Sequence, residues 1–377
     1  PFAYKNAMRN KRRTALTVLS VGGSLFLLAT LIAIYAAFYH REETPEQALR
    51  LITRHRVSLT FSLPEYYAAR VAQIPGVRMV ARESWFGGVY IDHKSEHRFA
   101  RFAADADKIF ALRPEWKINP EQRAAFEKER TAAAVGRTIA EPLGFRIGQK
   151  IVLQGDIYPG NHELTIRAIF EGPDDNLLYM HRDYLEETLP QRRRGQTGFL
   201  TIMAESPEAV PRIAAAVDEM FRNSPQQTKT ESERAFNLSF VSMIGNVKLI
   251  IFSISAAVMF AILLVAANTM AMSARERIAE VGVLKTLGFT PGKVVALIVG
   301  EAVILSLAAG VIGNALAAWM VAVIGKMPVF FIQGMKLPPA AVAITLGVGL
   351  LVGVASSLVP ALSAARMPIP EALRHTG

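Results

Sequence analysis

The segment from Met272 to Val294, MSARERIAEVGVLKTLGFTPGKV, joins two strongly apolar stretches of the chain. The stretch before it, Leu249–Ala274, and the stretch after it, Ala302–Gly325, contain no Asp, Glu, Lys or Arg. Both are longer than the roughly 20 residues that an α-helix needs to cross about 30 Å of hydrocarbon. We therefore interpret the segment as a charged connection between two membrane-spanning helices.

Two further uncharged stretches, Thr14–Tyr39 and Leu337–Ala365, have the same character. A long core helix of a soluble protein normally keeps a polar face, which argues against burial as the explanation for all four. A cleaved signal peptide is the alternative for the first stretch, but 26 uncharged residues are long for such a signal. The sequence thus predicts an α-helical membrane protein with four transmembrane helices.

The positive charge of the chain is concentrated beside these four stretches. The whole chain has a net charge of +10, but residues 40–248 contain 29 Lys and Arg against 28 Asp and Glu. Basic residues flank membrane spans on the cytoplasmic side, so this distribution indicates membrane topology rather than a basic surface for nucleic acid. It predicts cytoplasmic N- and C-termini and places residues 40–248 outside the cytoplasm.

The long stretch between the first and second spans is sufficient for a domain with its own core. Alternating apolar residues predict strands, as in HELTIRAIFEG, and a helical period follows the strand in GFLTIMAESPEAVPRIAAAVDEM. We predict a large α+β extracytoplasmic domain, and a division into two lobes would fall near Glu171–Asp175. The chain has no cysteine and shows no catalytic motif, so no catalytic, metal-binding or cofactor-binding residue is predicted.

The charged connection itself has the pattern of a short amphipathic helix. Its apolar residues recur at helical spacing and form one stripe: Ile278, Val281, Leu284 and Leu287. Gly288 stands where a helix would end in a left-handed residue, and Thr290 and Pro291 suit the cap and first turn of the next helix. We therefore expect a short helix, a sharp turn and then the third span.

Charges of both signs on this helix predict a docking surface for a protein partner. The residues concerned are Arg275, Glu276, Arg277, Glu280 and Lys285. A passive loop at the membrane interface is the alternative, but anionic lipid would disfavour its two glutamates. Mixed charges set register and orientation between proteins, which favours the docking interpretation.

The sequence ARERIAEVGVLKTLGFTPGKV resembles the cytoplasmic coupling segment of MacB/FtsX-like permeases of ABC transporters, also called type VII. The family pattern is present at Glu276, Arg277, Glu280, Val281, Gly282, Lys285, Thr286 and Gly288. The stretches NAMRNKRRTALTVLSVGGS, GEAVILSLAAGVIGNALA and PALSAARMPIPEALR resemble the family's N-terminal helix, third span and C-terminal end. Valine at 281 and threonine at 286 depart from the usual isoleucine and alanine.

The resemblance and the charge pattern together predict a succession of segments along the chain. These are a cytoplasmic amphipathic helix (1–13), the first span (14–39), a MacB-like periplasmic domain (40–248), the second span (249–274), the coupling helix and turn (275–293), the third span (294–325), a short periplasmic loop (326–336), the fourth span (337–362) and a cytoplasmic tail (363–377). Gly282, Gly288 and Pro291 are expected to shape the turn. Glu301 is expected near the cytoplasmic membrane interface.

The resemblance implies a non-catalytic permease subunit in a bacterial inner membrane. Its implied partners are a dimer of cytoplasmic ABC ATPases, which bind the ATP, a second permease copy or a related permease, and a periplasmic adaptor or lipoprotein. ATP-driven motion would reach the outer domain through spans one and two, and YAAFYHREETPEQALRLITR (35–54) and SERAFNLSFVSMIGNVK (232–248) could continue those spans as stiff stalks.

Three functions stay open at this point. The first is export or extraction of a substrate, and the second is relay of ATPase motion to a cell-envelope enzyme, as FtsX-like proteins would do. The third is a membrane-anchored receptor or hydrolase. The chain itself is not expected to bind ATP, because GFTPGKV lacks the spacing of a phosphate-binding loop and follows no strand.

Overall fold

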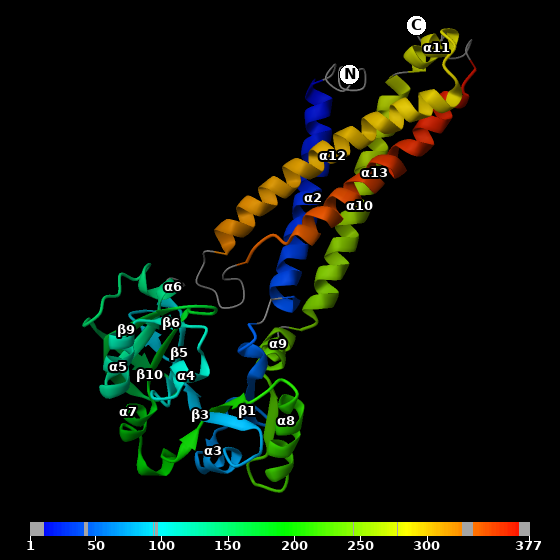
Figure 1. Cartoon of the computed structure of the whole chain (residues 1–377). Helices are drawn as coiled ribbons and strands as arrows, with labels where there is room; N and C mark the ends of the chain where they lie inside the picture. The colour runs from blue at the N-terminus through cyan, green and yellow to red at the C-terminus, as the bar shows by residue number, and fades with distance from the viewer. Residues whose placement is uncertain are drawn as a thin grey trace. The chain divides into compact units, whose positions relative to one another are not determined.

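The computed structural model describes residues 11–40, 44–92, 94, 97–243, 245–276, 278–325 and 335–368. The chain divides into a unit of long helices, here called the helical unit, and a mixed domain, here called the inserted domain (Figure 1). The inserted domain is formed by the chain between the first two long helices. The predicted fold class, four spanning helices with an α+β domain between the first and second, is confirmed.

Among the residues that the structure describes, four helices of the helical unit are long and apolar enough to cross a membrane. They are α2 (Lys11–Tyr39), α10 (Val247–Glu276), α12 (Pro291–Ile324) and α13 (Pro339–Arg366). The short helix α11 (Ile278–Thr286) lies between α10 and α12 in sequence. Both α12 and α13 begin with proline, which fits the first helical position because the N–H there has no intrahelical partner.

Small residues bring α2, α12 and α13 into close contact. A Cβ atom added at Gly313 of α12 would lie 2.6 Å from the carbonyl oxygen of Gly22 in α2. Between α12 and α13, the buried Thr345 hydroxyl donates to the Asn314 side-chain oxygen at 2.9 Å. Lipid offers no hydrophobic driving force for helix association, so such close packing and polar contacts hold membrane helices together.

Three predicted segments fall wholly or partly outside the described residues. Residues 1–10 belong to the predicted N-terminal amphipathic helix, 326–334 to the predicted short loop and 369–377 to the predicted C-terminal tail. The structures of these segments stay predictions.

The inserted domain is built on a mixed sheet with the strand order β13-β1-β12-β3-β5-β10-β7-β9-β8-β4, and β6 pairs with β9. Its strands are β1 (Arg50–His55), β3 (Val77–Trp85), β4 (Val89–Tyr90), β5 (Ala100–Ala104), β6 (Lys117–Ile118), β7 (Ala132–Gly136), β8 (Lys150–Gly155), β9 (Gly160–Glu171), β10 (Leu177–His181), β12 (Phe199–Ala204) and β13 (Thr228–Ser232). A separate pair is formed by β2 (Leu63–Pro64) and β11 (Gln196–Thr197).

The helices of the inserted domain pack on this sheet. They are α3 (Tyr66–Val71), α4 (Ile109–Leu112), α5 (Pro120–Lys128), α6 (Arg137–Ala140), α7 (Arg182–Glu187), α8 (Ala209–Met220) and α9 (Glu233–Met243), with single 3₁₀ turns at η1 (Gln47–Leu49) and η3 (Gln191–Arg193). One core lies where α3 and α8 cover β1, β3 and β12. Two further cores lie around β5, β7, β9 and β10.

The lobe boundary expected at Glu171–Asp175 is wrong. Strand β9 before this segment and β10 after it contribute Phe170 and Leu177 to one hydrophobic cluster. Strands β3 and β12 are paired neighbours although the chain from β4 to β11 lies between them in sequence, so one sheet runs through the whole domain. A local run of turn residues gave no sign of this long-range pairing.

The stiff stalks expected at 35–54 and 232–248 are also wrong as continuous helices. Helix α2 ends at Tyr39, and residues 44–49 form a turn and the η1 turn before β1. Helix α9 ends before Gly245, whose φ of +113° belongs to the left-handed region. Pro45 lacks a backbone donor and Gly245 takes a non-helical conformation, so neither segment can continue a helix through these points.

Candidate functional site

The connection between α10 and α12 contains the short helix α11 and a sharp turn. The amide of Phe289 donates to Leu284 O and that of Gly288 to Lys285 O, each at 3.1 Å. With φ of +87° at Gly288, this is the Schellman arrangement that satisfies the last carbonyls of a helix. Thr290 then occupies the N-cap of α12, although its side chain makes no capping hydrogen bond. The structure therefore has a turn at Gly288, followed by a helix that begins at Pro291, as expected.

Gly282 was expected to shape the same turn, and this is wrong. It lies inside α11 and is buried. Its neighbour Val281 is 4% exposed and packs in a cluster with Val294 of α12 and Ala364 and Ala365 of α13. Gly282 therefore belongs to the buried side of α11 and not to the turn.

Lys285 fixes α11 to the end of α13. Its ammonium group donates to Ala365 O and to Met367 O, each at 2.7 Å. The last carbonyls of a helix lack intrahelical donors and carry partial negative charge, so a lysine there is favourable both as a donor and as a cation. Lys285 therefore supplies hydrogen bonds to carbonyl groups at the C-terminus of α13, although Ala365 is 80 residues away in sequence.

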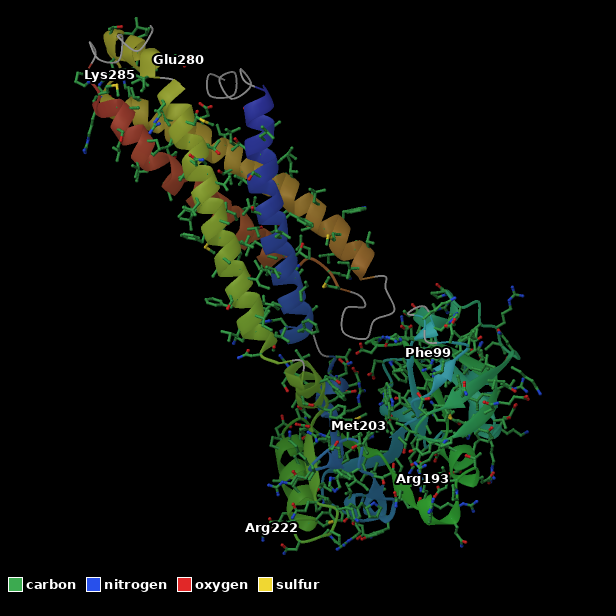
Figure 2. All side chains as sticks on the ribbon, turned by 180° about the vertical axis from the view of Figure 1, so that it is seen from behind. Phe99, Arg193, Met203, Arg222, Glu280 and Lys285 are labelled. Atoms are coloured by element: carbon green, nitrogen blue, oxygen red, sulfur yellow. The ribbon has the colours of Figure 1, made fainter. Side chains whose placement is uncertain are left out.

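The remaining charged residues lie around the junction of α10 and α11. Arg275 is exposed in the last turn of α10, and Glu280 is half-buried in the first turn of α11. Figure 2 shows Glu280 and Lys285 on α11 at one end of the helical unit. The side chain of Glu276 and the whole of Arg277 lie outside the described residues. The docking role predicted for this set stays a prediction.

Of the apolar stripe predicted on this helix, only part is buried. Val281 lies in the cluster with α12 and α13, whereas Leu287 is 72% exposed beyond the end of α11. Glu301, ten positions into α12, is 6% exposed and therefore lies within the helical unit. A carboxylate in a span is costly unless it is removed from lipid, and its burial meets that requirement.

The described contacts of this site attach α11 to its neighbouring helices. A charged helix is held against two spans by a packed apolar cluster and by a cation on a helix terminus. Within the described ranges, no group of three or more His, Asp or Glu side chains is placed to hold a metal ion. Sequence reasoning assigned Lys285 to the surface, and it missed the contact with α13 because nothing local marks a partner so distant in the chain.

Comparison with known proteins gives the family. The family model described as MacB-like periplasmic core domain matches residues 14–220, and the FtsX-like permease C-terminal model matches residues 252–369. The chain belongs to the MacB/FtsX-like ABC transporter permeases. The C-terminal match includes α11 and the turn at Gly288.

Other proteins are similar to this MacB/FtsX-like permease over the whole chain or over its inserted domain. An uncharacterized ABC transporter permease of Methanocaldococcus jannaschii is 23% identical over 394 residues, which cover 99% of this chain and 96% of the relative. The periplasmic region of MacB from Actinobacillus actinomycetemcomitans aligns with 52% of this chain and 93% of its own, at 9% identity and a TM-score of 0.38. The extracellular domain of the ABC-type transporter YknZ from Gram-positive bacteria aligns with 48% and 99%, at 10% identity and a TM-score of 0.37.

Proposed function

We propose that this permease transmits ATP-driven motion of a separate cytoplasmic ATPase to its inserted domain, and so exports or extracts a substrate at the outer face of the membrane. The observation that carries the proposal is the attachment of α11. This helix presents charge between two spans and is fixed to α12 and α13 by the Val281 cluster and by Lys285. A force applied to α11 is therefore applied to those spans.

The docking charges in this proposal are Arg275, Glu276, Arg277 and Glu280. Lys285 has a different part, because its ammonium group already binds two carbonyls of the chain itself. It positions α11 so that a docked ATPase moves the spans instead of bending a loose connection. Rigid attachment is what distinguishes a coupling element from a passive linker.

The proposed topology has both termini and α11 in the cytoplasm and the inserted domain outside it. The excess of Lys and Arg outside residues 40–248 supports this orientation. A second permease copy and a pair of ATPases are the partners that the proposal requires, in a bacterial inner membrane. ATP would be bound by the ATPase subunits, with a periplasmic adaptor or lipoprotein as a further partner.

The docking assignment is tested by charge reversal. In Glu276→Lys/Glu280→Lys, we expect the chain to insert normally and the ATPase to be lost on co-purification, because two attractive contacts become repulsive. The matched control is Glu219→Lys with Glu163→Lys, two reversals at exposed sites of the inserted domain. Co-purification of the ATPase at the wild-type level with the reversed α11 would show that docking occurs elsewhere.

A further inference from the structure

Arg50, the first residue of β1, is a buried cation that joins three segments of the inserted domain. The residue is 1% exposed. Its Nη1 and Nη2 atoms donate to the two carboxylate oxygens of Glu115 at 3.0 and 2.5 Å, and its Nε donates to Glu233 at 2.7 Å. Nη1 also donates to Leu112 O at 3.0 Å. Every nitrogen of the guanidinium group is thus engaged, and both charge partners raise the pKa of Arg50 against the opposing effect of burial.

The cluster around Arg50 lies where the chain enters the first strand of the inserted domain and leaves the last one. Strand β1 is the first strand after α2, whereas β13 and α9 are the last elements before α10. Strands β1 and β13 are antiparallel neighbours, paired from Leu51 with Ser232 to His55 with Thr228. The connections to both spans therefore leave this strand pair from the same end, and Arg50 and Glu233 lie at that end.

A force that separates two such connections acts on the strand pair as unzipping. The load falls first on the outermost interaction, then on each backbone pair in turn, so the ladder opens one bond at a time. The Arg50–Glu233 contact lies outside the first backbone pair, and Glu115 ties the same cation to the segment after α4. Buried, bidentate and charge-assisted contacts are among the strongest in proteins, and breaking one leaves a buried charge without a partner.

We propose that Arg50, Glu115 and Glu233 form a clamp that makes the two connections move as one. Displacement of α2 and α10 then moves the inserted domain as a body instead of opening its sheet. This inference rests on the proposed function, since it requires ATP-driven motion of the spans. It does not require continuous helical stalks, because a load from either span would enter the domain beside the paired ends of β1 and β13.

The test compares amide hydrogen exchange with and without ATP turnover, in the full-length chain with its co-purifying ATPase in lipid nanodiscs. The clamp variant is Arg50→Met/Glu115→Gln/Glu233→Gln, which removes the cation and leaves no unpaired buried charge. We expect its β1 and β13 amides to exchange about tenfold faster during turnover than without nucleotide, whereas wild-type amides exchange equally in both states. A merely stabilising role would raise exchange to the same extent in both states, and that result would overturn the clamp.

A matched control and a rescue make the result specific. Arg54 and Glu231 form a second ion pair on the same two strands, farther from the open end, so Arg54→Met/Glu231→Gln should show no dependence on ATP. The chain has no cysteine, and the buried hydroxyls of Thr53 and Thr230 lie 2.9 Å apart across the pair. Thr53→Cys/Thr230→Cys added to the clamp variant should restore wild-type exchange in β1 after Thr53 and in β13 before Thr230 when oxidised, and lose it when reduced.

Failure of the clamp and failure of the proposed function give different results. If the oxidised disulfide leaves the ATP-dependent exchange unchanged, the two connections do not part during turnover and the clamp is refuted while the permease assignment stands. If the wild-type chain recruits no ATPase, the proposed function fails first and the clamp fails with it.

Discussion

Replacing Lys285 by methionine should loosen α11 from the end of α13. The substitution keeps the aliphatic stem but removes the two hydrogen bonds to Ala365 O and Met367 O. A hydrogen bond from a charged donor contributes about 1.5–3 kcal/mol when buried. Because Lys285 is only half-buried, solvent screening lowers this contribution. We therefore expect the two hydrogen bonds together to stabilise the attachment of α11 by about 2 kcal/mol.

A loss of this size makes local opening of α11 about 30-fold more frequent, since each 1.4 kcal/mol is a factor of ten. Hydrogen exchange of the α11 amides in nanodiscs measures that opening directly. Lys285→Arg keeps a cation with several donors and should retain most of the protection. Lys293→Met, the same change at an exposed position in the first turns of α12, is the control and should have no effect. Equal exchange in Lys285→Met and the control would refute the anchoring role of Lys285.

Three further predictions concern stability. Gly288→Ala should destabilise the solubilised chain by about 1 kcal/mol because its φ is +87°, whereas Gly292→Ala, with open space around it, should not lower the melting temperature. Gly313→Ala should cost about 1–3 kcal/mol through overpacking against α2, and Gly23→Ala, which meets no atom within 4 Å, should cost much less in the same thermal assay. Burial lowers the pKa of His181 below its usual 6.5. On lowering the pH, the unfolded chain therefore binds this proton before the folded chain does, and the free energy of unfolding should fall as the pH drops below about 6.5. His181→Gln should reduce this pH dependence in unfolding curves between pH 7.5 and 5.5, and an unchanged dependence would show that this histidine is not responsible.

The four spanning helices and the turn after α11 could be predicted because their causes are local. A stretch without charge that exceeds the membrane thickness has few alternatives to a spanning helix, whatever the rest of the chain does. The turn follows from one residue that tolerates a positive φ and one that lacks an amide donor, Gly288 and Pro291. The charge balance on either side of the spans is likewise a property of composition.

The tertiary structure alone decided which distant groups meet. Lys285 binds carbonyls 80 residues away, and Arg50 binds carboxylates 65 and 183 residues away. The pairing of β3 with β12 across the chain from β4 to β11 has the same origin. Such contacts depend on how whole helices and strands pack, and a charged residue has the same appearance in a sequence whether it faces solvent or holds two segments together. The sequence therefore determined which stretches can cross the membrane, and the folded structure determined which side chains join segments that are distant in the chain.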